Sequence, residues 1–306
     1  GVRSTALRTL RKLNKTTLSS HADAVVAMLS DSDPQVRADA LATVGNFKLA
    51  TLTQHAGAVV ARLEDSDEGV RRSALATLSK LKLATLTQHA DVVAAGLEDD
   101  HHSVRFAASL TLRTLKPAVL ADVVVPRLEH SSHQVRIAAL NSLRKQASLA
   151  QHVVARLEDS HAHVRRSALE MLGTMLEPLA LHAGAVASRL EDSDDLVRYM
   201  ALMTLSKLKP AALTRHADAV ASRLVDSDFY VRNCALEALG KLEPATLAHH
   251  AYSVVAILED DRSHLRDQAL ETLHKLPRFV THGVDFTSSA LRSRLLGRLA
   301  WYRCRL

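Results

Sequence analysis

Residues 65–81 have the sequence DSDEGVRRSALATLSKL, and similar sequences recur along almost the whole chain. The Val-Arg pair at its centre recurs at intervals of 34, 34, 34, 31, 29, 33, 34 and 34 residues. A near-constant period of this length is typical of a solenoid in which each repeat is one supersecondary unit. The copies begin at Val2, Val36, Val70, Val104, Val135, Val164, Val197 and Val231, with Leu265 as a ninth.

Each copy of the repeat reads as two helices. After Val70, the residues Ala74, Leu75, Leu78 and Leu81 fall at helical spacing and make one apolar stripe. A second segment, of the type Leu-x-x-His-Ala-x-x-Val-x-x-Arg-Leu, predicts the other helix of the hairpin. One hairpin cannot bury its stripe alone, so neighbouring hairpins must stack. An Asp three residues before the Val is suited to cap the start of the helix, and it is present as Asp33, Asp67, Asp194 and Asp228.

The composition agrees with a helical array. Ala and Leu dominate the 47% of the chain that is hydrophobic, whereas aromatic residues make up 3% and only ten residues are Gly. Such a chain builds its core from many small, similar layers of Leu, Val and Ala. We therefore predict an all-α fold, an α-solenoid of about eight to nine tandem helical hairpins over residues 1–277.

The repeat resembles the HEAT family, of the short kind called PBS-lyase HEAT-like repeats. The resemblance rests on an Asp that stands six places before an Arg in each unit. It implies that these residues link successive units in a ladder of charged hydrogen bonds. The unit around Arg136 departs from the pattern, because His130 occupies the Asp position, and we expect a weaker ladder there. The ladder residues are Asp31, Arg37, Asp65, Arg71, Asp99, Arg105, Asp159, Arg165, Asp192, Arg198, Asp226, Arg232, Asp260 and Arg266.

Irregular repeats are where we expect a binding site. The repeats that begin at Val104 and Val135 lose three and five residues, beside the first helix of the following hairpin, in 117–128 and 147–157. The loss of about one helical turn predicts a local notch and a change in curvature. Neutral drift is the alternative, because helix ends tolerate deletions.

Large apolar residues stand where solvent is expected. The position two after the repeat Val faces away from the stripe, and we expect it on the concave face of the solenoid. It carries Phe106, Ile137 and Tyr199 in a chain that is poor in aromatic residues. Exposed aromatic and Met side chains anchor protein interfaces. The alternative is that these side chains fold back over small residues such as Ser109. The nearby residues Met200, Met203, Phe229 and Tyr230 complete the predicted partner-binding set.

Histidines form two series. One lies in the turns of three consecutive repeats, where a zinc or copper site, or a pH-sensitive joint, is one interpretation. A metal site needs three or four converging ligands. No Cys or spaced carboxylate accompanies these residues, so polar turn residues account for the pattern and we predict no metal and no cofactor. The other recurs once per repeat and predicts a packing role, since layers about 8–10 Å apart cannot share an ion. The turn series is His101, His102, His130, His133, His161 and His163; the helical series is His21, His55, His89, His152, His182, His216 and His250.

The basic charge is concentrated at one end of the chain. Residues 278–306 hold six Arg against Asp285 alone, whereas the preceding residues hold 33 basic and 32 acidic groups. We predict no nucleic-acid binding by the array, because a repeated basic stripe is missing. The segment 278–306 predicts a basic C-terminal helix that caps the last repeat or docks on a partner. Membrane binding is expected only through this segment, since no run of 18 apolar residues occurs.

No catalytic motif is found in the sequence. HEAT-like di-iron hydroxylases use His-Glu pairs, and no His-Glu dipeptide or Gly-rich phosphate loop occurs here. We predict a non-enzymatic protein-binding scaffold or adaptor that uses its concave face. A structural subunit of a large assembly, and a lyase or chaperone-like protein that handles a cofactor, remain as alternatives.

The surroundings of the chain are predicted only in outline. Cys234 and Cys304 lie 70 residues apart and form no disulfide framework, which favours a reducing intracellular compartment without identifying it. The sequence begins at Gly1 inside a repeat and stops at Leu306 without a polar end. We therefore expect that it is part of a longer chain or of a complex.

Overall fold

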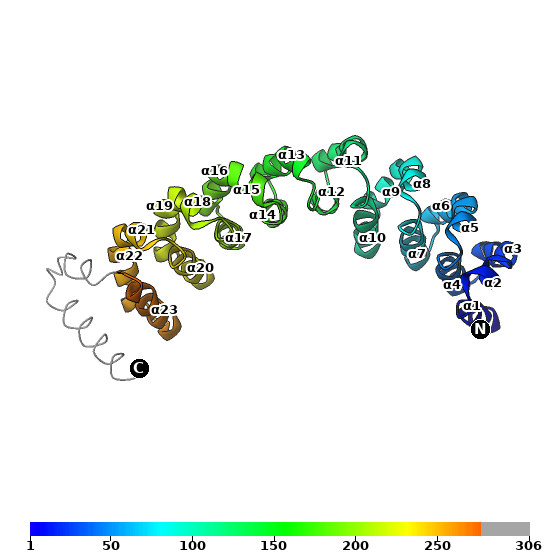
Figure 1. Cartoon of the computed structure of the whole chain (residues 1–306), viewed down its shortest axis with the longest axis horizontal. Helices are drawn as coiled ribbons and strands as arrows, with labels where there is room; N and C mark the ends of the chain where they lie inside the picture. Colours follow the sequence, from blue (N-terminus) through cyan, green and yellow to red (C-terminus); the bar gives the residue numbers. More distant parts are fainter. Residues whose placement is uncertain (277–306) are drawn as a thin grey trace. The chain divides into compact units, whose positions relative to one another are not determined.

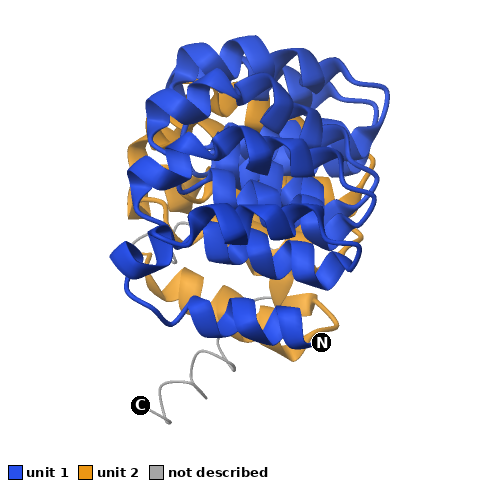
Figure 2. Cartoon of the chain, turned by 90° about the vertical axis from the view of Figure 1, so that its right-hand side faces the viewer, with its two compact units in different colours: residues 1–174 blue, residues 175–306 orange. Residues whose placement is uncertain are grey.

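The computed structural model describes residues 1–276, which form α-helices and short 3-10 helices and contain no β-strand. The all-α prediction is therefore confirmed. Residues 278–306, for which we predict a basic helix, lie outside the described residues. The chain divides into two compact units, residues 1–174 and residues 175–306 (Figure 2). None of the helices in residues 1–276 has the length and apolar content that crossing a membrane requires.

Each repeat contributes one longer helix that begins close to its Val-Arg pair, and we call these the second helices. In unit 1 they are α1 (Val2–Leu10), α4 (Pro34–Val44), α7 (Glu68–Leu78), α10 (His102–Leu112), α12 (His133–Ser142) and α14 (Ala162–Leu172). In unit 2 they are α17 (Asp195–Leu205), α20 (Phe229–Leu239) and α23 (Ser263–His274).

The first helix of a regular hairpin is broken into two short segments. These pairs are α2 (Lys15–Ser19) and α3 (Ala22–Ala27), α5 (Leu49–Gln54) and α6 (Ala56–Val60), α8 (Leu83–Gln88) and α9 (Ala90–Ala95), α15 (Leu176–Leu181) and α16 (Ala183–Ser188), α18 (Pro210–Leu213) and α19 (Ala217–Ala221), and α21 (Pro244–His249) and α22 (Ala251–Ala256). The two shortened hairpins have one segment each, α11 (Pro117–Val123) and α13 (Ala150–Ala155).

Short 3-10 helices follow the first helices toward the turns, except for η5, which precedes α13, and η8, which lies between α18 and α19. They are η1 (Met28–Ser30), η2 (Ala61–Glu64), η3 (Gly96–Glu98), η4 (Val125–Glu129), η5 (Ala147–Leu149), η6 (Arg156–Glu158), η7 (Arg189–Glu191), η8 (Thr214–His216), η9 (Ser222–Val225) and η10 (Ile257–Glu259).

A histidine of the helical series stands at the break in the first helix. His55 ends α5 and precedes α6, with φ −101° and ψ 13°, outside the regular helical range. Its side chain is half-buried, and its Nε2 lies 4.0 Å from a carboxylate oxygen of Asp23 in the preceding repeat. His250 makes the same kind of approach to Asp218, at 3.9 Å. These contacts between hairpins fit the packing role that the recurrence predicts.

The second helices stack in chain order within each unit. In unit 1, α1, α4, α7, α10, α12 and α14 pack successively, and in unit 2 α17, α20 and α23 do so (Figure 1). The first helices form the other layer of each unit. The apolar stripe lies between the layers, where Val70, Leu75 and Leu78 are fully buried. Burial of each such side chain contributes about 1.5–3 kcal/mol, so stacking supplies the stability that one hairpin lacks.

Asp side chains cap four of the nine second helices in residues 1–276, the four for which the sequence predicts such a cap. A carboxylate oxygen of Asp67 accepts the backbone N–H of Val70 at 3.0 Å, and Asp194 and Asp228 make the equivalent contact. Asp33 accepts from the N–H of Gln35 at 2.9 Å. Each cap contributes about 1 kcal/mol.

A column of buried threonines joins neighbouring second helices, and the sequence analysis did not predict it. The Thr77 hydroxyl lies 3.0 Å from the carbonyl oxygen of Leu41 in α4 and 2.8 Å from that of Ser73 in its own helix. Thr111 is placed in the same way between Leu75 and Ala107. A hydroxyl here can donate across the helix–helix contact without leaving a buried polar group unpaired.

The hairpin that loses five residues also changes its connection. Lys145, between α12 and η5, has φ 67°, in the left-handed region that favours Gly. The short connection forces this conformation on a residue with a Cβ, at a cost of about 1–2 kcal/mol.

Candidate functional site

The ladder residues of successive repeats form ion pairs. Arg71 Nε donates to Asp99 Oδ2 at 2.7 Å and Arg71 Nη2 donates to Asp99 Oδ1 at 3.0 Å. Arg71 Nη1 donates to the carbonyl oxygen of Asp65 at 2.8 Å. Each Arg thus joins the turn of its own repeat to the carboxylate of the next. The same two-point pair joins Arg37 to Asp65, Arg136 to Asp159, Arg198 to Asp226 and Arg232 to Asp260.

These pairs keep the carboxylates charged inside the turns. Burial alone raises the pKa of Asp65, but hydrogen bonds from Arg37 and from the Asp67 N–H outweigh it, so the pKa is lowered. Asp99, Asp159 and Asp226 have lowered pKa values for the same reasons. Two-point pairing of a guanidinium with a carboxylate is among the stronger polar contacts in proteins.

The ladder is interrupted between Arg105 and His130. Arg105 Nη1 donates to the carbonyl oxygens of Asp99 and Asp100, both at 2.7 Å. Among residues 1–276, no carboxylate pairs with the Nε and Nη2 edge of Arg105. His130 Nδ1 accepts the N–H of Ser132 at 3.1 Å, as the replaced Asp would, but it supplies no anion. One guanidinium edge in unit 1 is therefore left without a carboxylate.

An exposed apolar pair lies on the same helix as Arg105. Phe106, which follows Arg105 in α10, is 57% exposed, and Leu110 is 42% exposed. The two are four residues apart, so they neighbour each other on one helix face. Ile137, at the equivalent position of α12, is half-buried. Leu110 was not predicted from the sequence, where its only distinguishing feature is its four-residue spacing from Phe106.

The predicted residues of unit 2 fall into two places. Tyr199, Met200 and Met203 are half-buried on α17. Burial raises the pKa of Tyr199, with smaller contributions from Cys234 and Glu237 of the next second helix. The hydroxyl is therefore neutral and available as a hydrogen-bond donor at physiological pH.

Phe229 and Tyr230 lie at the start of α20, beside the turn. Their ring centroids are 5.3 Å apart, and the Arg262 guanidinium carbon lies 5.3 Å from the Phe229 centroid. Tyr230 is 66% exposed, whereas Phe229 is half-buried. This edge differs from the helix face that carries Tyr199.

Three of the six turn histidines converge. One ring nitrogen each from His133, His161 and His163 lies within 4.8 Å of the others. No metal site was predicted among the turn histidines, because no Cys or spaced carboxylate accompanies them in the sequence. The spacing along the chain does not show that these three rings converge.

The repeat agrees with a known family. Residues 22–113 and 183–274 match the family model of HEAT repeats, and together they cover more than half of the chain. The chain belongs to the HEAT-repeat family. Residues 142–172 of this HEAT-repeat protein also match the model of the HEAT repeat associated with sister chromatid cohesion.

Solved structures share the HEAT-repeat fold. An engineered protein is 16% identical, with 96% of this chain and 90% of that chain covered and a TM-score of 0.51. Importin β, crystallised in an ammonium sulfate condition, is 14% identical with a TM-score of 0.57. The comparison covers 86% of this chain but only 41% of importin β. At these identities the likeness shows the fold alone. No match was found among curated proteins.

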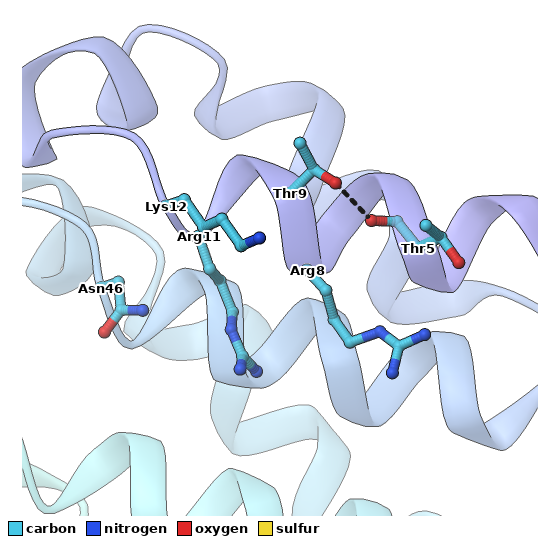
Figure 3. A pocket seen from close by; sticks show the side chains of 6 residues that line it. All are labelled: Thr5, Arg8, Thr9, Arg11, Lys12 and Asn46. Atoms are coloured by element: carbon cyan, nitrogen blue, oxygen red, sulfur yellow. Dashed lines mark hydrogen bonds between the residues drawn. The ribbon is translucent and has the colours of Figure 1, made fainter.

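A basic hollow lies at the first HEAT repeat of unit 1. Arg8, Arg11 and Lys12 line it together with Thr5, Thr9 and Asn46 (Figure 3). Within the described part of the chain, none of the three cations makes an ion pair. Nearby, burial lowers the pKa of Lys80, and Arg11 and Lys15 lower it further. The near-zero charge sum over the repeats had concealed this local excess, which favours an anionic group.

Proposed function

We propose that this HEAT-repeat protein is a non-enzymatic scaffold that binds a partner protein through the face of its second helices. The observation that carries the proposal is that two successive residues of α10, Arg105 and Phe106, offer a cationic edge and an exposed aromatic ring. Arg105 has a guanidinium edge without a carboxylate, and Phe106 is 57% exposed. Aromatic residues and Arg are the side chains that most often dominate the free energy of protein binding.

The charge and the apolar side chains of this patch favour one class of partner segment. An Asp or Glu of the partner would supply the carboxylate that His130 does not, and it would accept two hydrogen bonds from Arg105. An apolar side chain of the same segment would cover Phe106 and Leu110. The basic hollow around Arg8, Arg11 and Lys12 in the same unit also favours a partner with acidic character. We therefore expect an acidic segment that carries apolar anchors.

The other predicted residues have secondary roles in this proposal. Ile137, Tyr199, Met200 and Met203 are half-buried and offer less area to a partner than Phe106. Phe229 and Tyr230 form an edge that is suited to an apolar or cationic contact beside Arg262. Each of these groups is proposed as a contact within its own unit.

A structural subunit of a large assembly is the second candidate. It is favoured by apolar side chains in the first-helix layer of unit 2, where Leu176 is 64% exposed, Leu181 79% and Val225 82%. In that case partner contacts would fall on this layer instead of on α10.

Cross-linking and mass spectrometry of the parent protein in its native extract distinguish the two candidates. The scaffold predicts cross-links around α10 and α12 that are lost on Phe106→Asp and kept on Val92→Asp, a control at an exposed apolar residue of α9. Cross-links that are unchanged by Phe106→Asp and that cluster near Leu176, Leu181 and Val225 would instead identify a structural subunit. With the partner segment in hand, Phe106→Ala should weaken binding at least about tenfold.

A further inference from the structure

The histidine cluster is built from two successive repeats. His133 is the first residue of α12, His161 is the N-cap residue of α14, and His163 is the second residue of α14. The rings of His133 and His161 are stacked, with centroids 3.8 Å apart and planes within 6°. The ring of His163 lies 5.2 Å from that of His161, at a steep angle.

The repeat geometry holds these rings together. The first residue of one second helix meets the N-cap residue of the next, and the same relationship places Arg262 over Phe229 in unit 2. The two helices that carry the histidines are also joined by the Arg136–Asp159 pair, at 2.7 Å between Nη2 and Oδ1. Asp159 is two residues before His161, and Arg136 three after His133. The cluster therefore stands on a rigid joint.

The chemistry of the cluster suits a metal ion. A neutral imidazole is the ligand form of His. Three imidazole nitrogens with an open fourth position form a ligand set for zinc, and also for copper or nickel.

We propose that His133, His161 and His163 bind one divalent transition-metal ion of the zinc class across this joint. The fourth ligand is water or a side chain of a partner. The ion would connect two repeats at the hairpin that has lost five residues.

Binding requires the rings to rearrange. A tetrahedral zinc ion with Zn–N bonds of about 2.0–2.1 Å holds its nitrogens about 3.3 Å apart, so the stacked rings must turn toward one point. His161 Nδ1 accepts the backbone N–H of His163 at 3.2 Å, and the ion competes with this cap. This cap is a single hydrogen bond, and it provides less free energy than the binding of structural zinc. The His133 and His161 rings are half-buried and His163 is exposed, so side-chain rotation is open to them.

Zinc titration of the full chain tests the proposal. After chelator treatment, Zn²⁺ binding is measured in competition with a chromophoric chelator, and Co²⁺ absorption reports tetrahedral coordination. His133→Gln, His163→Gln and His161→Asn are the test variants, since Asn preserves the helix cap. The matched control is His101→Gln with His102→Gln, two turn histidines that lie outside the cluster.

We expect one zinc equivalent per chain that binds at least about tenfold more weakly in each test variant and unchanged in the control. Circular dichroism verifies that all variants are folded. Equal zinc affinity in the natural sequence, the test variants and the control overturns the site. So does the absence of a stoichiometric equivalent in the natural sequence.

Discussion

Arg136 and Asp159 form a two-point ion pair, with Nε–Oδ2 2.8 Å and Nη2–Oδ1 2.7 Å, although the hairpin between them has lost five residues. The side chains are 10% and 4% exposed. The ladder contact is therefore retained where the first helix is shortened, and the loss is absorbed by the helix and by the left-handed Lys145. The turns are conserved in geometry while the first helices vary in length.

Arg136→Ala should destabilise the fold strongly. The substitution leaves the buried Asp159 carboxylate with only the more distant Arg156, whose Nη1 lies 4.0 Å away, and loss of one partner of a buried pair costs at most about 3–5 kcal/mol. Arg105→Ala is the matched control, because it removes only hydrogen bonds to two carbonyl oxygens and should cost about 1 kcal/mol. Urea unfolding followed by circular dichroism measures both. Equal losses would mean that the carboxylate pair contributes little.

Acid should weaken the array through the ladder carboxylates. The pKa values of Asp65, Asp99, Asp159 and Asp226 are lowered in the fold, so their contribution is complete above the unfolded value of about 3.9. It is lost as the pH falls from that value through the lowered folded values. Urea midpoints measured between pH 6 and pH 3 should fall at the acid end. Asp159→Asn should show a shallower fall, and a slope equal to that of the natural sequence would contradict this assignment.

His130→Asp should complete the ladder. The new carboxylate can accept from the Ser132 N–H, as His130 Nδ1 does, and can also pair with Arg105. We expect a gain of about 1–2 kcal/mol in the free energy of unfolding. The gain should vanish in the double variant with Arg105→Gln. The same substitution should weaken the proposed partner, because its carboxylate then competes with an internal one; unchanged partner binding would argue against Arg105 as a contact.

Cys234 should be inert in the folded chain. Burial, with a smaller contribution from Glu237, raises the pKa of its thiol to about 12, so the reactive thiolate is scarce at neutral pH. In a Cys304→Ser background, a thiol reagent at pH 8 should react slowly with the native protein and fully after denaturation. Rapid native labelling would show that the second-helix layer opens at α20.

Much of the fold could be predicted from the sequence, because the same pattern of apolar and capping residues recurs in each repeat. The Val-Arg period, the apolar stripe after Val70 and the Asp caps define hairpins that must stack. The break at residues such as His55 was not predicted, since it depends on how two segments pack on the neighbouring hairpin. The threonine column was missed for a similar reason: Thr77 is an ordinary helix residue until the carbonyl of Leu41 is placed beside it.

The candidate site was predicted only in part. Phe106 was identified because aromatic residues are rare in this chain, but Leu110 is one of many Leu residues and gave no such signal. Charge summed over the repeats concealed the basic excess at Arg8, Arg11 and Lys12. His133 and His161 stand 28 residues apart, and only the stacking of α12 on α14 brings their rings together.

The gap between Arg105 and His130 has a mechanical consequence. In a repeat array each repeat contacts mainly the repeats before and after it, so a pulling force is transmitted from one contact between repeats to the next. The joints with an Arg–Asp ladder pair resist extension with a two-point contact. This joint lacks that pair and is held by apolar packing, the Arg127–Glu98 ion pair and the hydrogen bond from Arg113 to the Asn141 carbonyl oxygen. Under tension, the contact between α10 and α12 should therefore be the first contact between second helices in unit 1 to separate.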